Sequence, residues 1–154
     1  MSVPIDDIDR TLLAALLADG RASASDLAET ADVATATVTK RLSRLEDDGV
    51  IEGFQPEIDY DAAGYGTTAV FRLDVDGEGL SEVVADLQAT GRMIGVYEVT
   101  GEHDVVAIGK FTGTGELNEQ IKTLLTHPHV RATSTNIVLE TVSEYDAPPV
   151  APAE

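Results

Sequence analysis

The chain has 154 residues, with 28 acidic and 10 basic side chains, a formal net charge of −18 at pH 7 and no cysteine. The lack of cysteine excludes disulfides, thiolate metal sites and a cysteine nucleophile. No apolar run approaches the roughly 20 residues of a membrane span, and no export leader is visible at the amino terminus, so we expect a cytoplasmic protein without a membrane partner.

The first part of the chain has a helical pattern. Residues 5–19 predict a helix that stops at Gly20, and its apolar face is expected to consist of Ile8, Leu12, Leu16 and Leu17. A second helix should begin directly after Ser23, because Ser23 and Asp26 have the spacing of a capping box. It should end near Asp32, a residue type that tolerates the left-handed backbone of a sharp turn.

A third helix should follow a short turn, with Thr35 or Thr37 as its cap. Its buried stripe is predicted to be Val38, Leu42 and Leu45. Gly49 ends this helix, and residues 50–51 are expected to start a strand of a β-hairpin. Two short helices joined by such a turn fit the helix-turn-helix, whose second helix enters the major groove of DNA. Residues 1–53 therefore predict a winged helix-turn-helix DNA-binding domain.

Positive charge is concentrated on the third helix. Residues 1–53 hold 11 acids and 5 bases. This net negative charge is the wrong sign for an ordinary DNA-binding protein, which gains affinity by releasing the counterions of the DNA phosphates. Three of those bases are nevertheless close together, at Lys40, Arg41 and Arg44. We expect the arginines to donate bidentate hydrogen bonds to guanine and Lys40 to contact a phosphate. Hydroxyl contacts to backbone oxygens, or methyl contacts to thymine, are expected from Thr35, Thr37 and Thr39.

The alternative is a helix face that is merely solvated. Charged side chains on a helix surface usually face water, and Arg44 has the spacing to pair with Asp47 or Asp48. The helix-turn-helix context favours contact with DNA.

The acidic composition favours function in molar salt. At about 1 M salt the screening length is about 3 Å, which largely removes the repulsion between an acidic surface and DNA. Lys is scarce, Asp and Thr are abundant, and the acids are spread over both domains. This pattern resembles the proteins of salt-accumulating haloarchaea. The alternatives are a merely acidic mesophilic protein and a protein that does not bind nucleic acid.

The second part alternates strands with helices. Strands are expected at 67–75, at 93–100, at 105–111 and through 137–139. The first of them alternates, with Ala69, Phe71, Leu73 and Val75 on one face, which predicts a half-buried strand. Helices are expected near 80–87 and 117–125. The first helix should open near Gly79, and the second should be capped by Thr112 or Thr114. The order βαββαβ predicts a ferredoxin-like domain over residues 67–146, with both helices on one face of an antiparallel sheet. Residues 54–66 are expected to form a linker strand, and the Pro-rich tail 147–154 to be disordered.

Several spaced motifs agree in order with one known family: Ile5 to Arg10, Gly20-Arg21, Asp26 to Ala28, Val38, Arg41, Arg44 to Glu46 and Gly49 to Ile51. In these positions the chain resembles the Lrp/AsnC family of prokaryotic transcription regulators, and the resemblance continues through the second half. Two positions depart from the family pattern: Ala34 stands where a capping Ser is usual, and Asp32 where a turn glycine is usual. The resemblance implies an α+β regulator that binds double-stranded DNA and assembles as a homodimer, with tetramers or octamers beyond it.

The segment 101–104 resembles the family's Gly-x-x-Asp loop, which implies an amino-acid effector there. The candidate effector residues are Gly101, Glu102, His103, Asp104, Thr133 and Thr135. Asp104 would accept from the ammonium group, amides near Gly101 would hold the carboxylate, and the two threonines would add hydroxyls. The alternative is a tight hairpin capped by Asp104. Glu102 and His103 are not typical of the family, so the effector's identity does not carry over.

When helices cover one side of a sheet, its other side must either pack against a partner or be exposed to solvent. Val70, Val96 and Val106 are expected on that open face, which the resemblance assigns to a second copy. A dimer also suits a two-fold-related DNA site with half-sites about 34 Å apart.

Neither a metal nor a cofactor is expected. The chain has three histidines, His103, His127 and His129. His127 and His129 lack the four-residue spacing of a helical pair, no cysteine is available to complete a soft metal site, and residues 127–129 are predicted to form the turn before the last strand. His129 stands where the family tends to have Gly, so a left-handed backbone is expected there.

An enzyme is not expected either, because no phosphate loop or catalytic set is recognisable. The sequence predicts a DNA-binding regulator tuned by a small molecule. The alternatives are an effector-independent architectural DNA protein and a sensor module that has lost DNA binding.

Overall fold

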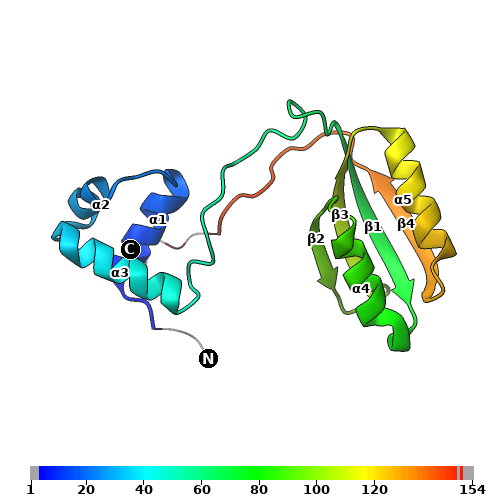
Figure 1. Ribbon diagram of the computed structural model, residues 1–154, viewed down its shortest axis with the longest axis horizontal. Helices are drawn as coiled ribbons and strands as arrows, with labels where there is room; N and C mark the ends of the chain where they lie inside the picture. Colours follow the sequence, from blue (N-terminus) through cyan, green and yellow to red (C-terminus); the bar gives the residue numbers. More distant parts are fainter. Residues whose placement is uncertain (1–3, 149, 151–154) are drawn as a thin grey trace. The chain divides into compact units, whose positions relative to one another are not determined.

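The computed structural model describes residues 4–148 and 150. The chain forms two compact units, Met1–Glu57 with Ser143–Glu154 and Ile58–Val142, and each has its own core (Figure 1). The expected disordered tail falls largely outside the described residues, which include only 147, 148 and 150 of it. Over the described ranges, no helix has the length and apolar character needed to cross a membrane.

The first unit is helical, and its described helices are α1 (Asp7–Ala18), α2 (Ala24–Ala31) and α3 (Thr35–Asp47). A reciprocal capping box of Asp6 and Asp9 opens α1. The expected box of Ser23 and Asp26 opens α2 and is confirmed. Asp32 has a φ of 51°, which confirms the left-handed turn between α2 and α3.

The core of this unit lies between the three helices and consists of Leu12, Leu27, Ala28 and Val38, with Ile8, Leu16 and Leu42 packed against it. Leu17 was expected on the same face, but 58% of it is exposed. At 3.6 residues per turn it lies roughly 140° around α1 from Leu12, so it faces away from the core.

The expected strand at residues 50–51 is not formed in the described structure. Gly49, with a φ of 71°, turns the chain back at the end of α3. The amides of Val50 and Ile51 then donate to the carbonyl of Leu45 at 2.8 and 3.0 Å. Because these amides close the last turn of the helix, they are not available for a strand ladder.

The segment 54–66 also contains no strand, contrary to the expected linker strand. It makes a turn in which the Tyr65 amide donates to the Tyr60 carbonyl at 2.7 Å. The ammonium of Lys110 lies 5.7 Å from the Tyr60 ring centre, and the guanidinium of Arg92 lies 5.3 Å from that of Tyr65. Cation–π contacts therefore hold this segment to the second unit in place of a ladder.

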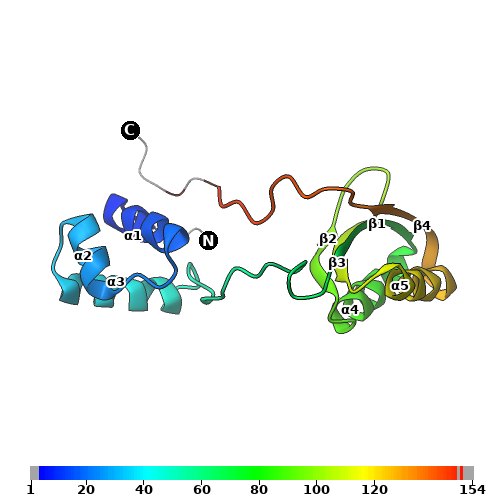
Figure 2. The same cartoon turned by 90° about the horizontal axis from the view of Figure 1, so that it is seen from above.

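The second unit confirms the ferredoxin-like arrangement. In chain order it contains β1 (Thr67–Val75), the short 3₁₀ helix η1 (Gly77–Gly79), α4 (Leu80–Ala89), β2 (Met93–Glu98), β3 (Val105–Phe111), α5 (Thr114–Thr126) and β4 (Val130–Ile137). The antiparallel sheet has the order β2-β3-β1-β4. Both helices cover the same face, as Figure 2 shows. The second and fourth strands each end two residues earlier than expected.

The core of this unit lies between the sheet and its two helices. Alternate residues of β1 point into it, as expected: Ala69, Phe71, Leu73 and Val75. The rings of Phe71 and Phe111 meet edge to face with centres 5.9 Å apart. Val83 and Leu87 of α4 pack against these side chains from the helix side of the core. Burial of each large side chain contributes roughly 1.5–3 kcal/mol to folding.

The open face of the sheet differs from the expectation at one position. Val70 and Val106 lie on it, but Val96 packs against the core on the helix side. The register between β2 and β3 shifts between Met93 and Gly95, which places Val96 opposite the inward-facing Ala107. A bulge of this kind reverses the side that the following residues face.

The start of α5 was also predicted wrongly. Gly113 is the N-cap and supplies no side chain, whereas both the amide and the hydroxyl of Thr112 donate to Glu116 at 2.8 Å. Leu125 of α5 is 62% exposed because it lies roughly 100° around the helix from the buried Leu124.

The turn of residues 127–129 precedes β4 as expected. It is closed by the Val130 amide, which donates to the His127 carbonyl at 3.2 Å. This turn needs no left-handed residue, and His129 is not among the described residues with positive φ, so the expected left-handed backbone there is wrong.

Candidate nucleic-acid interface and effector loop

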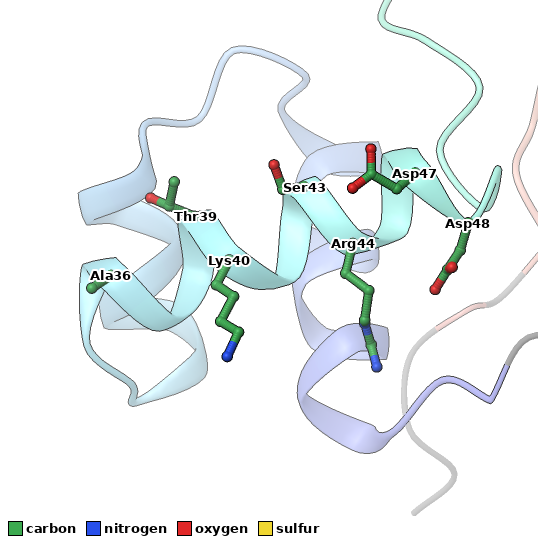
Figure 3. Close-up of a pocket in the computed structure, with 7 residues that line it drawn as sticks. All are labelled: Ala36, Thr39, Lys40, Ser43, Arg44, Asp47 and Asp48. Carbon is green, nitrogen blue, oxygen red and sulfur yellow. The ribbon is translucent and has the colours of Figure 1, made fainter.

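The exposed side of α3 carries a shallow hollow. Its lining consists of Ala36, Thr39, Lys40, Ser43, Arg44, Asp47 and Asp48 (Figure 3). Lys40 and Arg44, one turn apart, extend from one side of the helix, while Ser43 and Asp47 extend from another. The hollow therefore presents two cations, hydroxyls and methyl groups, with the carboxylates of Asp47 and Asp48 at one end, on the helix that the sequence predicts to enter the major groove.

Arg41 is directed elsewhere and joins α3 to the start of α1. Its Nη1 donates to Oδ2 of Asp6 at 2.7 Å and to Oδ1 of Asp9 at 2.9 Å. Arg44 Nη2 donates to the second oxygen of Asp9. Asp9 is fully buried, whereas the side chains of Arg41 and Arg44 remain 23% and 44% exposed. We name these four residues the Asp–Arg network.

The Asp–Arg network keeps both carboxyl groups ionised. The amide of Asp9 and the Arg41 guanidinium lower the pKa of Asp6 to about 2. Burial alone would raise the pKa of Asp9, but hydrogen bonds from the Asp6 amide, Arg41 and Arg44 outweigh it and hold that pKa below its ordinary value. Hydrogen bonds to Asp6 and Asp9 raise the pKa of Arg41 in turn.

Helix α3 begins without a side-chain cap. Its N-cap is Ala34, so the expectation that Thr35 or Thr37 would cap it is wrong. Thr35 is already the first helical residue, and the Thr37 and Val38 amides donate to the Ala34 carbonyl at 2.8 and 3.2 Å. An uncapped helix start presents amide groups and a positive dipole end to any anion that approaches it.

The structure brings together only some of the residues predicted to contact DNA. Thr39, Lys40 and Arg44 line the hollow, and Thr35 and Thr37 are exposed at the start of the same helix. Four residues that line the hollow were not among the predicted DNA contacts: Ala36, Ser43, Asp47 and Asp48. For Ala36 and Ser43 the available signal was helical spacing from Lys40, four residues back and three forward.

The alternative pairing of Arg44 is also corrected. Its carboxylate partner is Asp9 of α1, not Asp47 or Asp48 one turn along its own helix. Arg41, which we expected at the DNA surface, belongs to the same network. Both arginines therefore connect parts of the fold, and Arg44 alone of the two also borders the hollow.

The predicted effector loop, residues 101–104, joins β2 to β3. Gly101 has a φ of 119°, a conformation that favours glycine. The Asp104 carboxylate accepts the Val75 amide at 2.7 Å, and Arg131 Nη2 lies 3.5 Å from the same oxygen. Asp104 therefore closes the end of β1, which is the contact expected of a structural turn residue.

The other two residues of this loop differ in exposure, since the His103 side chain is 27% exposed, whereas Glu102 lies on the exposed surface. His103 Nδ1 lies 2.8 Å from Oδ1 of Asp74. The Asp104 side chain itself remains 44% exposed despite its hydrogen bonds. The loop thus presents two carboxylates and an imidazole to solvent.

Thr133 and Thr135 do not join this loop. They pair with Leu73 and Phe71 of β1, on the side of the sheet that the helices cover. Their hydroxyl oxygens are buried without a hydrogen-bond partner among the described residues. The sheet order places β1 between β4 and the strands that the loop connects, and the side chain of β4 that reaches Asp104 is Arg131.

Comparisons with known proteins agree with both halves of the chain. A model of winged helix-turn-helix DNA-binding domains matches residues 5–52. A model of the Lrp/AsnC ligand binding domain matches residues 68–148.

Similar proteins cover nearly the whole chain. An uncharacterized HTH-type transcriptional regulator of Pyrococcus furiosus is 36% identical over 140 residues, which are 91% of this chain and 95% of that protein. The HTH-type transcriptional regulator FL11 of Pyrococcus horikoshii is 33% identical over 150 residues, which are 97% of this chain and 99% of the relative.

Solved structures show the same fold. The feast or famine regulatory protein of M. tuberculosis, complexed with L-methionine, has a TM-score of 0.87 at 30% identity and covers 95% of this chain and 99% of its own. E. coli AsnC has a TM-score of 0.86 at 21% identity, over 94% of this chain and 99% of its own. The chain belongs to the Lrp/AsnC family of transcription regulators.

Proposed function

We propose that this chain controls transcription by reading duplex DNA with the exposed side of α3, and that a free amino acid tunes this binding. The observation that carries the proposal is the hollow on α3, whose lining combines Lys40 and Arg44 with Thr39, Ser43 and the carboxylates of Asp47 and Asp48. Membership in the family makes the chain a DNA-binding regulator and not an enzyme, as the sequence predicted.

The side chains of α3 divide between reading and support. Lys40 is exposed and suits a phosphate oxygen. The Thr39 hydroxyl donates to the Thr35 carbonyl at 3.1 Å, so its methyl group is left to meet the methyl of a thymine. Arg44 is oriented by Asp9 and keeps part of its guanidinium exposed. Arg41 supports the domain through the Asp–Arg network and is not assigned to DNA.

The start of α3 adds a second contact with the DNA backbone. Because Ala34 provides no capping oxygen, a phosphate can take its place at the positive end of the helix. Thr35 and Thr37 are exposed beside that end and can donate hydroxyls to the same phosphate.

The acidic surface sets the conditions for this function. With a formal charge of −18, the chain would be repelled by DNA at low ionic strength. In molar salt, where the screening length is about 3 Å, only contacts at the interface itself matter. We therefore assign the protein to a salt-rich cytoplasm, as the scarcity of Lys suggests.

For the effector we infer a free amino acid at the loop 101–104. The ammonium group would meet the exposed carboxylates of Glu102 and Asp104, and amides near Gly101 would meet the carboxylate group. The L-methionine complex of the M. tuberculosis protein supports this class of ligand. Thr133 and Thr135 are left out of the site, because their hydroxyls lie under the helices.

We infer further that the working unit is a homodimer formed through the open face of the sheet. Val70, Val106 and Ile108 form an apolar strip there, and Tyr97, which is 54% exposed, lies beside Val106. A second copy would cover this strip and supply the second α3 that a two-fold-related DNA site requires.

A selection of bound sequences from random DNA duplexes in molar KCl tests the assignment of Thr39. The wild type should enrich one motif, and Thr39→Ser, which removes only the methyl group, should lose the preference for thymine at one position per half-site. The matched control is Thr123→Ser, because Thr123 of α5 makes the same hydroxyl bond to its own helix, to Glu119 at 3.0 Å. An unchanged motif in Thr39→Ser would contradict the assignment.

One observation favours a second function, that of an architectural DNA protein without an effector. The Asp104 carboxylate is already engaged with the Val75 amide and is near Arg131. If no amino acid changes DNA affinity or assembly in the same buffer, this second function replaces the first.

A further inference from the structure

Four potential metal ligands meet on the second unit, outside the surfaces assigned above. Glu82 and Asp86 lie one turn apart on α4, and His127 and His129 lie in the turn that enters β4. The spacing within the histidine pair alone argued against a metal. In the structure, the pair with four-residue helical spacing is Glu82 and Asp86 of α4, which lies beside the two histidines. Nothing in the sequence linked this pair to the histidines.

The distances between these side chains suit one small ion. His127 Nε2 lies 3.2 Å from Oδ2 of Asp86 and 4.0 Å from Oε1 of Glu82, and His129 Nε2 lies 3.8 Å from Oε2 of Glu82. One ligand atom each from Glu82, Asp86 and His127 all lie within 4.8 Å of one another. Ligands about 2.0–2.1 Å from a tetrahedral ion are separated by about 3.3 Å, so these three side chains need only small movements to close on an ion. His129 lies outside this group of three and reaches it through its contact with Glu82.

The two imidazoles are held in place by the fold. The side chain of His127 is only 9% exposed. His129 packs on the backbone of Gly79, where an added Cβ would lie 2.0 Å from its Cγ, and its carbonyl accepts the Asp76 amide at 2.9 Å. The carboxylates of Glu82 and Asp86 are 59% and 64% exposed, so they are free to adjust. The imidazole nitrogens are thus held by the fold, while the carboxylate oxygens can move to complete the coordination of an ion.

Binding would change the tautomer of His127. Its Nδ1 lies 3.2 Å from the His129 amide nitrogen, a contact that suits the tautomer whose hydrogen is on Nε2, the nitrogen that faces Asp86. An ion on Nε2 requires the other neutral tautomer: the ring gives up the Nε2 hydrogen and takes one from solvent at Nδ1, with no net release of a proton. The contact between Nδ1 and the His129 amide is then lost, because both nitrogens carry a hydrogen.

We propose that Glu82, Asp86, His127 and His129 bind one divalent transition-metal ion, with Zn²⁺ the best match. Two imidazole nitrogens and two carboxylate oxygens are ligands that Zn²⁺ accepts, whereas Mg²⁺ and Ca²⁺ prefer all-oxygen sites. The ion joins α4 to the start of β4, two residues before Arg131, and adds a cross-link to the second unit.

Equilibrium dialysis of the tag-free full chain against Zn²⁺ in molar KCl tests the site, with Co²⁺ absorption as a report on tetrahedral geometry. We expect one ion per chain and a rise in melting temperature with Zn²⁺ but not with Mg²⁺. Glu82→Gln, Asp86→Asn and His129→Gln should each weaken binding at least about tenfold, since even outer-shell partners of a metal commonly contribute 10–100-fold. The matched control is His103→Gln, which removes a histidine outside the cluster.

Diffuse binding to the acidic surface is the competing explanation, and these variants separate it from a site. It would be non-stoichiometric, displaced by Mg²⁺ and equal in the wild type and the variants, and that result overturns the proposal. Circular dichroism checks the fold of each variant. Glu82→Gln alters an exposed carboxylate, so its result decides the matter if a histidine variant does not fold.

Discussion

The substitution Asp9→Asn tests whether the Asp–Arg network holds the first unit together. Asp9 is fully buried and accepts from the Asp6 amide at 3.0 Å, from Arg41 at 2.9 Å and from Arg44. The amide side chain keeps the shape but removes the charge, and it turns donor hydrogens toward a guanidinium. A hydrogen bond to a charged group contributes about 1.5–3 kcal/mol net.

We expect a loss of about 2–4 kcal/mol in the free energy of unfolding of this unit. The value stays below the sum of the lost bonds, because both arginines remain partly exposed and keep water contacts once Asp9 is neutral. For a domain of this size the melting temperature should fall by roughly 8–30 °C. Circular dichroism during heating or urea titration, in molar KCl, measures both quantities.

The control is Asp7→Asn, the same chemical change at an exposed position in the first turn of the same helix. It should alter the free energy of unfolding by no more than about 0.5 kcal/mol. If Asp9→Asn is as stable as Asp7→Asn, the network does not support the domain, and the reassignment of Arg41 away from DNA loses its basis.

The remaining predictions concern DNA, acid, assembly and the loop. Lys40→Ala should reduce the slope of log affinity against log salt by about 0.9 per bound protomer, and an unchanged slope in fluorescence anisotropy would remove Lys40 from the phosphate contacts. The pKa values of Asp6 and Asp9 are lower in the folded chain than in the unfolded one, so their contribution to stability is complete above about pH 4 and is lost as the pH falls toward 2. Melting curves between pH 5 and 2 should show this loss in the wild type and less of it in Asp9→Asn. Val106→Asp should convert dimers to folded monomers in light scattering, and a persistent dimer would place the interface elsewhere. Gly101→Ala should cost about 1 kcal/mol or more in stability, because its φ of 119° strains any side chain, and an unaffected melting temperature would contradict that conformation.

Local signals in the sequence predicted much of the fold. The capping box of Ser23 and Asp26 acts over three residues, so spacing alone located the start of α2. The alternation along β1 likewise identified its buried side. The strand expected after Gly49 failed for an equally local reason, since the amides that follow Gly49 donate back to the end of α3. Sequence patterns do not show which of two local partners an amide chooses.

The candidate sites depend on contacts between distant parts of the chain, and these were less predictable. Arg41 and Asp9 are 32 positions apart, and no spacing rule links them. The side on which Val96 lies is set by the register shift in β2, which a regular alternation cannot anticipate. The pairing of Glu82 with His127 and His129 depends on how α4 lies beside the turn before β4. In each case the residue types were visible and their partners were not.

The most direct test of the account is binding of the purified full chain to labelled DNA from upstream of its own gene, measured by fluorescence anisotropy in molar KCl. The titration is repeated with each of the twenty amino acids and with Lys40→Ala. We predict specific binding that Lys40→Ala weakens and that at least one amino acid shifts. Absence of specific binding at every salt concentration, by a chain that circular dichroism shows to be folded, would contradict the central claim that α3 reads DNA.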